Sequence, residues 1–393
     1  MSGPLRNIRI VDLTSVLAGP FGSMLLADLG AEVIKIETLK GDDGRYLGPP
    51  FQKDESHMFL GINRNKKSIA LDLKKPEGRE IVLKLVARSD VFMENSRPGT
   101  MEKLGLDYKT LSAVNERLIY SSTTGYGLSG PYSHKAAYDL VLQGYASIMD
   151  RGENPPQRDK SSVVDMPSGM MIAISILAAL YSRQESGLGQ RVETSLLASS
   201  LAMQAHKLIR GEDRSQPIFD PTTGKYAAYR TYKAKDCYIN VAVLNETLFK
   251  KLCRVLGVEE LAEDERFKSH SARYENAEQL IAIFQKILEQ KTGKEWIRLL
   301  DEAGVPCGPV NTMEDLFEDE HILSNKLVVR QFHPAAGSIE TLGLPIKMDK
   351  TPLSIDSPAP LLGSHTEEVL AYLGYDKAGI EALRENQVIL NRT

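Results

Sequence analysis

One carboxylate is a candidate for chemistry because of its position in the sequence. Asp165 follows Val163-Val164 and precedes Met166-Pro167-Ser168-Gly169, and an apolar helical pattern then runs from Met170 to Leu180. The ordinary interpretation is a helix N-cap, since Asp at this position with Pro in the first turn is a common arrangement. The catalytic alternative is a carboxylate kept ionised by the helix N-terminus, which can act as a nucleophile toward an acyl group. The seven histidines are dispersed singly, so a Ser-His-Asp hydrolase site is not expected.

A glycine-rich segment, residues 125–130, has the spacing GxGxxG and follows an expected strand. A dinucleotide-binding loop would need its last glycine to open a helix and an acidic residue about 20 positions later. Pro131 delays any helix, and no acidic residue ends a strand at that distance. We interpret the segment as a flexible loop at a strand end that supports an active site, with Gly125 and Gly127 as candidate N–H donors to an oxyanion.

The segment from Thr14 to Pro20 joins the first expected strand to the first expected helix and is rich in small residues. In an open α/β sheet this turn usually meets the ligand. Its backbone N–H groups could bind a phosphate, a thioester carbonyl or an oxyanion. Tight packing of the helix against the strand explains the same residues equally well.

Five cations flank one expected strand, with Arg64, Lys66 and Lys67 before it and Lys74 and Lys75 after it. Such a run is usually a solvated edge. It is also a place where several point charges could hold a polyphosphate.

The chain that positions these groups has 393 residues and a formal net charge of −4. The length suggests two or three units of roughly 100 to 200 residues, each able to bury a core without metals or disulfides. The charge provides no global basic field for nucleic acid or an anionic membrane, so an anionic ligand needs a local patch.

The three cysteines are too few and too scattered for a disulfide framework or a zinc cluster. We expect no metal site and no permanently bound cofactor. The N-terminus has no secretory pattern, and the apolar stretch from Met170 to Leu180 is about half of the ~20 residues that a membrane span needs. We therefore expect a soluble cytoplasmic protein without membrane or nucleic-acid partners.

The first 40 residues predict a strand at Ile8–Leu13, a helix at Pro20–Leu29 and a strand at Ala31–Ile36, which form a βαβ unit of a parallel sheet. Further strands are expected at Ile69–Leu73, Val91–Glu94 and Leu118–Ser122, with helices at Glu77–Val86 and Tyr108–Val114. Residues 1–200 are therefore predicted to form a doubly wound parallel-sheet α/β domain.

The remaining chain divides into three parts. A helical pattern at Thr194–Ile209 gives way to a polar stretch without an apolar period. Residues 201–225 are expected to form a linker. Residues 226–324 predict a smaller α+β domain that opens with a hairpin around residues 233–236 and continues with helices at Asn245–Leu256, Asn276–Gln290 and Glu295–Ala303. Residues 325–393 contain short strands, a Pro-rich stretch and two short helices.

Together these segments resemble the family III coenzyme A transferases, which include formyl-CoA transferase and the carnitine CoA-transferase of bacteria. The resemblance spans nearly the whole chain. It is carried by residues 11–20, 26–37, 63–69, 71–73, 94–99 and 137–139.

The resemblance implies a large Rossmann-like domain, a small domain, a C-terminal segment that returns to the large domain, and a homodimer of two chains interlocked like rings. It also implies CoA transfer from an acyl-CoA to a small carboxylic acid, with Asp165 as a nucleophile that forms an acyl anhydride and then an aspartyl-CoA thioester. By position, the residues implied to touch CoA are Val16, Leu71, Lys74, Asn95, Lys103 and Tyr138. Asp139 takes the place of an acidic residue beside the nucleophile.

The chain also differs from members of this family at several positions. Formyl-CoA transferase has glutamine in place of Leu17, arginine in place of Thr38 and a glycine-rich loop where residues 241–245 stand here, so formyl or oxalate specificity is not implied. The same fold hosts 2-methylacyl-CoA racemases, which have a histidine where this chain has Tyr138. A phenol with a pKa of ~10 is a poor base at neutral pH, which favours transfer over racemisation. A non-catalytic CoA-binding protein is a third hypothesis, and the intact Asp165 argues against it.

Overall fold

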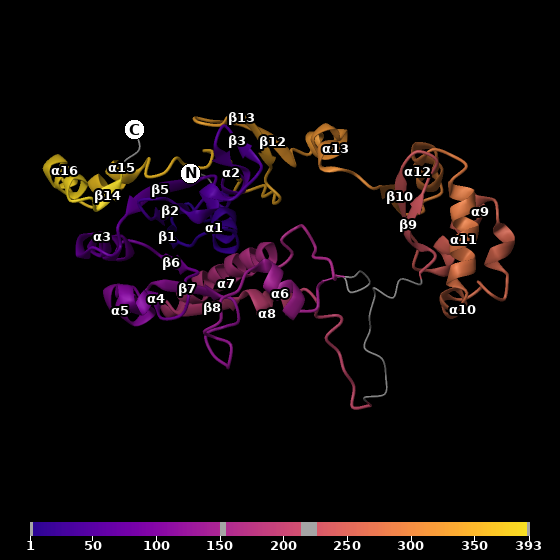
Figure 1. The fold of residues 1–393 in the computed structure, drawn as a ribbon, viewed down its shortest axis with the longest axis horizontal. Coiled ribbons are helices and arrows are strands. Elements are labelled where there is room, and N and C mark those ends of the chain that lie inside the picture. Colours follow the sequence, from indigo (N-terminus) through magenta and orange to yellow (C-terminus); the bar gives the residue numbers. More distant parts are fainter. Residues whose placement is uncertain (1–2, 150–154, 214–225, 391–393) are drawn as a thin grey trace. The chain divides into compact units, whose positions relative to one another are not determined.

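A computed structural model describes residues 3–149, 155–213 and 226–390 of the chain (Figure 1). The chain divides into two compact units, one of residues 1–216 with 324–393 and the other of residues 217–323. Residues 214–225 of the expected linker lie outside the described residues.

The first unit is built on a seven-stranded sheet with the order β14-β5-β2-β1-β6-β7-β8. Its strands are β1 (Arg9–Leu13), β2 (Glu32–Glu37), β5 (Lys66–Leu71), β6 (Val91–Glu94), β7 (Ile119–Thr124), β8 (Arg191–Ser195) and β14 (Ile389–Leu390). All neighbours are parallel except β14, which pairs antiparallel with β5. The six parallel strands follow the order of doubly wound dinucleotide-binding sheets, so the predicted parallel α/β sheet is confirmed.

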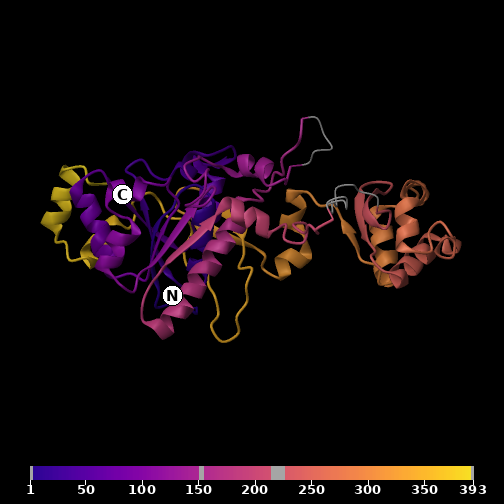
Figure 2. The ribbon, with the colours of Figure 1, turned by 90° about the horizontal axis from the view of Figure 1, so that it is seen from below.

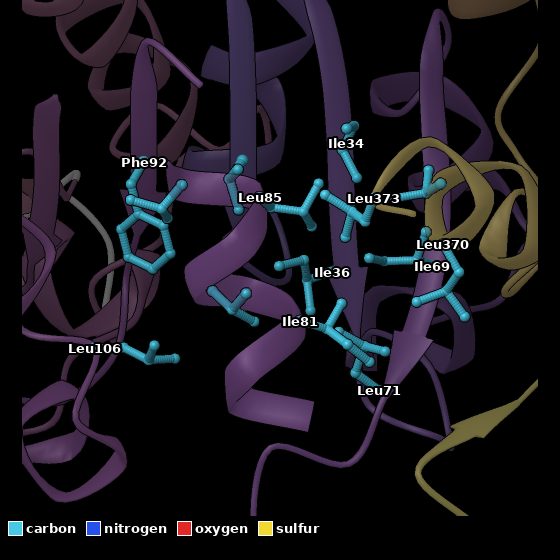
Figure 3. Packing of buried hydrophobic residues seen from close by; sticks show 14 of the residues in the cluster. Ile34, Ile36, Ile69, Leu71, Ile81, Leu85, Phe92, Leu106, Leu370 and Leu373 are labelled. Carbon is cyan, nitrogen blue, oxygen red and sulfur yellow. The ribbon is translucent and has the colours of Figure 1, made fainter. Parts of the chain in front are cut away.

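Side chains of each strand alternate between the two faces of this sheet. Ile10, Val33 and Val91 pack on one face with α1 (Ala18–Asp28) and α7 (Asp165–Ser186). Their neighbours Val11, Ile34 and Phe92 pack on the other face with α3 (Pro76–Val86) and α5 (Tyr108–Val114) (Figure 3). Both faces are therefore covered by helices, as parallel sheets require.

The C-terminal segment completes this unit. It contains the hairpin β12 (Val328–His333) and β13 (Gly337–Leu342), the helices α15 (Thr366–Tyr372) and α16 (Lys377–Glu385), and the edge strand β14. The helices, yellow in Figures 1 and 2, lie beside α3 and bury Leu370 and Leu383 in the same core as Ile81.

Shorter elements occupy the connections of the first unit. They are η1 (Asp43–Tyr46), β3 (Phe51–Gln52), β4 (Glu55–Ser56), α2 (His57–Ile62), α4 (Thr100–Leu104), α6 (Asp139–Tyr145) and α8 (Leu196–Ala202). The helix expected at Thr194–Ile209 is therefore wrong at both ends, because β8 occupies its first residues and α8 ends at Ala202.

The second unit packs helices on a three-stranded antiparallel sheet with the order β11-β10-β9. Its elements are β9 (Tyr229–Lys233), β10 (Tyr238–Ala242), α9 (Glu246–Leu256), η3 (Glu259–Ala262), α10 (His270–Glu275), α11 (Ala277–Leu288), α12 (Gly293–Glu302), β11 (Cys307–Pro309) and α13 (Met313–Glu318); α14 (Glu320–Ser324) follows at the boundary. The predicted hairpin and helices are confirmed, and Thr292 and Glu295 form a capping box at α12. Phe249, Phe284 and Trp296 fill the core of this unit.

Candidate active site

A cavity of about 210 Å³ opens at the carboxyl edge of the large sheet. The connections from β1 and β6 leave in opposite directions there, which creates the crevice where open α/β sheets bind ligands. The cavity is lined by the loops after β1, β6 and β7 and by the starts of α7 and α8; its residues include Ser15, Val16, Leu17, Ala18, Asp43, Asn95, Arg97, Gly125, Lys135, Tyr138 and Asp165.

Asp165 is the first residue of α7 and faces this cavity. Val164 occupies the N-cap position and Asp165 caps no N–H group, so the N-cap interpretation is wrong. Within the described ranges, no hydrogen bond holds the half-buried carboxyl group of Asp165. A carboxyl group placed in this way at the wall of a cavity is available to a ligand.

Asp139 fixes the backbone that carries Asp165. One of its carboxylate oxygens accepts hydrogen bonds from the N–H groups of Val164 (2.9 Å) and Asp165 (3.3 Å). The other accepts from the buried Gln143 amide at 2.6 Å. The two acidic residues therefore lie side by side, although 25 positions separate Asp139 from Val164.

The electrostatics of Asp165 differ from the sequence-based expectation. Burial raises the pKa of Asp165, and the nearby charge of Asp139 raises it further, to about 7. The helix start thus does not keep this carboxyl group ionised at low pH. Near neutral pH it is divided between its two forms, and the ionised form is more basic than an ordinary carboxylate.

Two glycines bring α1 and α7 together at the cavity. A Cβ at Gly169 would lie 2.7 Å from Phe21 Cδ1 and 2.8 Å from the carbonyl oxygen of Ala18, and one at Gly22 would lie 2.9 Å from the carbonyl oxygen of Gly169. At both positions the space leaves room only for the hydrogen atom of a glycine side chain. The close approach places the N-termini of both helices at the cavity, where Ala18 and Asp165 line the wall.

The loop between β1 and α1 presents few free donors of its own. Side-chain oxygens of Asp12, Asn95 and Asp42 accept from the N–H groups of Thr14, Ser15 and Val16, respectively. Ala18 and Gly19 lie in the first turn of α1, where backbone N–H groups have no intrahelical partner, and Leu17 at the N-cap supplies no side-chain acceptor for them. A Cβ at Gly19 would lie 2.3 Å from Thr14 Cβ, so tight packing and exposure of helix amides both occur here.

Gly125 and Gly127, in the loop after β7, differ in what they can offer the site. Gly125 lines the cavity, and its missing side chain admits Ala137, whose Cβ would lie 2.4 Å from an added Cβ. Gly127 has a φ of +97°, and its N–H donates to Thr124 Oγ1 at 3.0 Å. Gly127 therefore has no free N–H to offer an oxyanion. The next helix, α6, begins only at Asp139, so no helix opens at the last glycine of the loop as a dinucleotide-binding loop would need.

The structure brings some of the predicted CoA-binding residues together and separates others. Val16, Asn95 and Tyr138 line the cavity with Asp165. Lys74 and Lys103 are exposed and lie outside its lining, after β5 and on α4, and Leu71 is 1% exposed with its side chain in the sheet core. Only the Leu71 backbone could contact a ligand.

Three charged residues of the lining were missed as site residues: Asp43, Arg97 and Lys135. Arg97 and Lys135 are exposed cations, and Arg97 belongs to the segment 94–99 that carries the resemblance. Their positions after strand ends on this edge were the available signal.

The predicted cationic cluster is largely wrong as a phosphate site. Arg64 is buried and pairs with Asp28 at 2.7 Å, and Lys66 is buried 3.4 Å from Asp12, where burial lowers its pKa to about 7. Lys67 pairs with Glu32 at 2.8 Å and with Glu368 at 2.7 Å. These cations are neutralised by acidic residues on adjacent elements, at the amino end of β5. Of the five, Lys74 and Lys75 follow the carboxyl end, and Lys75 donates to the Asn386 carbonyl.

The chain is similar to known proteins over nearly its whole length. The model of CoA-transferase family III matches residues 5–366. The mouse protein named succinyl-CoA:glutarate CoA-transferase is 37% identical over 98% of this chain and 90% of its own length. The acetyl-CoA:oxalate CoA-transferase of Acetobacter aceti is 35% identical over 88% of this chain and 89% of its own. The crystal structure of a CAIB/BAIF family protein from Brucella suis superposes with a TM-score of 0.84 at 36% identity, covering 95% of this chain and 100% of that one.

Proposed function

The chain belongs to CoA-transferase family III and is an acyl-CoA:carboxylate CoA-transferase, and we propose that Asp165 is its covalent nucleophile. The observation that carries this proposal is the carboxyl group of Asp165 at the wall of the cavity, where no residue in the described part of the chain forms a hydrogen bond with it. Burial and Asp139 also raise its pKa to about 7. Partial desolvation leaves the ionised form more basic and less shielded by water, which suits attack on a thioester carbonyl.

In the proposed reaction, a carboxylate oxygen of Asp165 bonds to the thioester carbonyl carbon, the C–S bond breaks and CoA leaves as a thiolate. The thiolate then attacks the Asp165 carbonyl carbon, releasing the donor acid and leaving an aspartyl-CoA thioester. The acceptor carboxylate attacks this thioester, giving a second anhydride and CoA thiolate. Attack of that thiolate on the acceptor acyl carbon forms the new acyl-CoA and restores Asp165. Each step exchanges acyl groups between carboxylates and a thiolate, so no water is consumed.

Each tetrahedral intermediate carries an oxyanion that needs donors. The first-turn amides of α1 support this role better than Gly127, whose N–H is engaged by Thr124. Asp139 contributes by fixing the backbone before Asp165 and by raising the pKa of its carboxyl group.

We propose a dicarboxylic acid as the acceptor. The succinyl-CoA:glutarate relatives motivate this choice, and the exposed Arg97 and Lys135 at the cavity could bind a second carboxylate. Initial rates with succinyl-, acetyl- and formyl-CoA against glutarate, oxalate and butyrate test it. A higher kcat/KM for a dicarboxylate than for butyrate supports the assignment, and equal values would contradict it. Turnover with none of these pairs would count against the proposed choice of donor and acceptor.

Racemisation is the less favoured alternative. The position that would carry a basic histidine holds Tyr138, which is 67% exposed at the cavity. Loss of the α-proton of a 2-methylacyl-CoA to deuterated water, without CoA transfer, would favour racemisation.

We propose that two chains form the functional homodimer. One side of α7 exposes Met170, Met171, Ile174 and Tyr181. This 22-residue helix is longer than the apolar stretch noted in the sequence. By length and composition it could cross a membrane, and 39% of its most apolar 18 residues are buried inside the unit. Its opposite side packs on α1 and the sheet, as in the core helix of a globular unit. A second copy covering the apolar side accounts for these exposed residues.

A further inference from the structure

Val16, at the wall of the cavity, has a backbone conformation that is unfavourable for its residue type. Its φ is +72°, in the left-handed region. A β-branched residue rarely adopts this region, and such residues persist only where surrounding groups hold them. Val16 lies between β1 and α1, so its φ angle sets the direction in which the chain enters the helix.

Two side chains from other loops hold this segment. Asp42 Oδ1 accepts a hydrogen bond from the Val16 N–H at 3.0 Å. Asn95 contacts the preceding residue twice, since its Oδ1 accepts from the Ser15 N–H at 3.0 Å and its Nδ2 donates to the Ser15 carbonyl at 2.8 Å. The backbone is thus bonded on both sides of the Ser15–Val16 peptide.

Asp42 is itself fixed by buried partners. Its Oδ2 lies 2.7 Å from the Lys35 ammonium group, which also donates to the Thr14 carbonyl at 2.8 Å. Asp42 accepts from the Gly44 N–H at 2.8 Å and donates its own N–H to Glu37 at 3.0 Å. Burial alone would raise the pKa of Asp42, but Lys35 and the hydrogen bonds outweigh it and lower the pKa, so the acceptor stays anionic.

We propose that Asp42, supported by Lys35, is a positioning residue for acyl transfer that acts by holding Val16 in the left-handed conformation. With Val16 held, the N–H groups of residues 14–16 point away from the substrate into their side-chain acceptors, and the first turn of α1 faces the cavity. Without Asp42, Val16 relaxes to negative φ and the turn into α1 rotates. The inference rests on the proposed function, because it assigns a role in the same cavity.

The test is a double-mutant cycle of Asp42→Ala and Val16→Gly, measured as kcat and KM for succinyl-CoA. Asp42→Ala should lower kcat by about 10- to 100-fold with a smaller change in KM, since misplacement of reacting groups acts mainly on the chemical step. Asp42→Asn keeps a neutral acceptor and should recover activity to within about fivefold of wild type. Glycine adopts positive φ without strain, so in the Val16→Gly background the effect of Asp42→Ala should be at least about fivefold smaller.

Asp28→Asn is the matched control. Asp28 is equally buried in an ion pair with Arg64 but lies at the far end of α1, so this variant should lower the unfolding temperature and leave kcat within about twofold. An equal effect of Asp42→Ala in both Val16 backgrounds would overturn the proposal, as would loss of kcat in Asp28→Asn to the same extent as in Asp42→Ala.

The cycle is also measured on the free energy of unfolding, which needs no turnover. Coupling between the two positions in stability without any transferase activity of the wild type would mean that Asp42 holds Val16 but that the proposed function is wrong. Wild-type turnover without coupling in either measurement would refute the role of Asp42 alone.

Discussion

The rate of acyl transfer should depend on pH through the ionisation of Asp165. Only the ionised carboxyl group can attack a thioester, and the pKa of Asp165 is raised to about 7 by burial and by Asp139. The value of kcat/KM should therefore rise with pH, with a midpoint near 7, and level off about one unit above it. At pH 5 about 1% of the enzyme carries the ionised group, so the rate should be about 100-fold below the plateau.

The assay is the initial rate of acyl-CoA consumption between pH 5 and 9 at constant ionic strength, with the acceptor acid ionised throughout. Asp139→Asn removes a neighbouring charge but not the burial, so its midpoint should be lower than that of the wild type and still above the ordinary value of 3.8. Asp107→Asn, at the N-cap of α5 outside the cavity lining, is the control and should not move the midpoint. A rate that is flat from pH 5 to 8 would refute this reasoning.

Three further predictions concern stability and assembly. Asp165→Asn should increase the free energy of unfolding by roughly 2 to 4 kcal/mol at pH 8, because folding raises the pKa of the native carboxyl group and so disfavours its ionised form. At pH 3.5 the carboxyl group is mainly protonated in both the folded and the unfolded state, so urea unfolding should show little difference between the variant and the wild type. Equal stability at pH 8 would contradict the raised pKa. Gly169→Ala should destabilise the protein by about 1 to 3 kcal/mol, because its Cβ would press on Phe21 and Ala18. Gly61→Ala, with no atom within 4 Å of the added Cβ, is the control and should be neutral or stabilising. Similar unfolding temperatures for both variants would count against the tight α1–α7 crossing. Sedimentation should show a dimer that Ile174→Glu dissociates, and a stable wild-type monomer at micromolar concentration would argue against the homodimer.

The sequence predicts the central strands of the sheet well and its edge strands poorly. β1, β2, β6 and β7 were found within one or two residues, because their apolar side chains are buried on both faces. β8 was missed because Arg191 and Glu193 face outward at the sheet edge, which gives the segment no apolar period of its own. β14 has only two residues and is defined by its pairing with β5.

The candidate site was predicted less completely because its electrostatics depend on contacts distant in sequence. The position of Asp165 at a helix start was visible, but its pKa depends on burial and on Asp139 from another helix. Arg64, Lys66 and Lys67, around the start of β5, were interpreted as a solvated edge or a phosphate site. Nothing local in the sequence shows that Asp28, Asp12 and Glu32 pair with them. The hydrogen bond from the Val16 N–H to Asp42 joins residues 26 positions apart, and no sequence pattern indicates it.

The central claim is that Asp165 becomes acylated during turnover. Hydroxylamine added with succinyl-CoA should attack the activated Asp165 carbonyl, and peptide mass spectrometry should then find a hydroxamate on Asp165 in the wild type. No hydroxamate should form without acyl-CoA or in Asp165→Asn, which should fold with almost no turnover. A hydroxamate on another carboxylate such as Asp43, or more than a few per cent of wild-type activity in Asp165→Asn with deamidation excluded, would contradict the account.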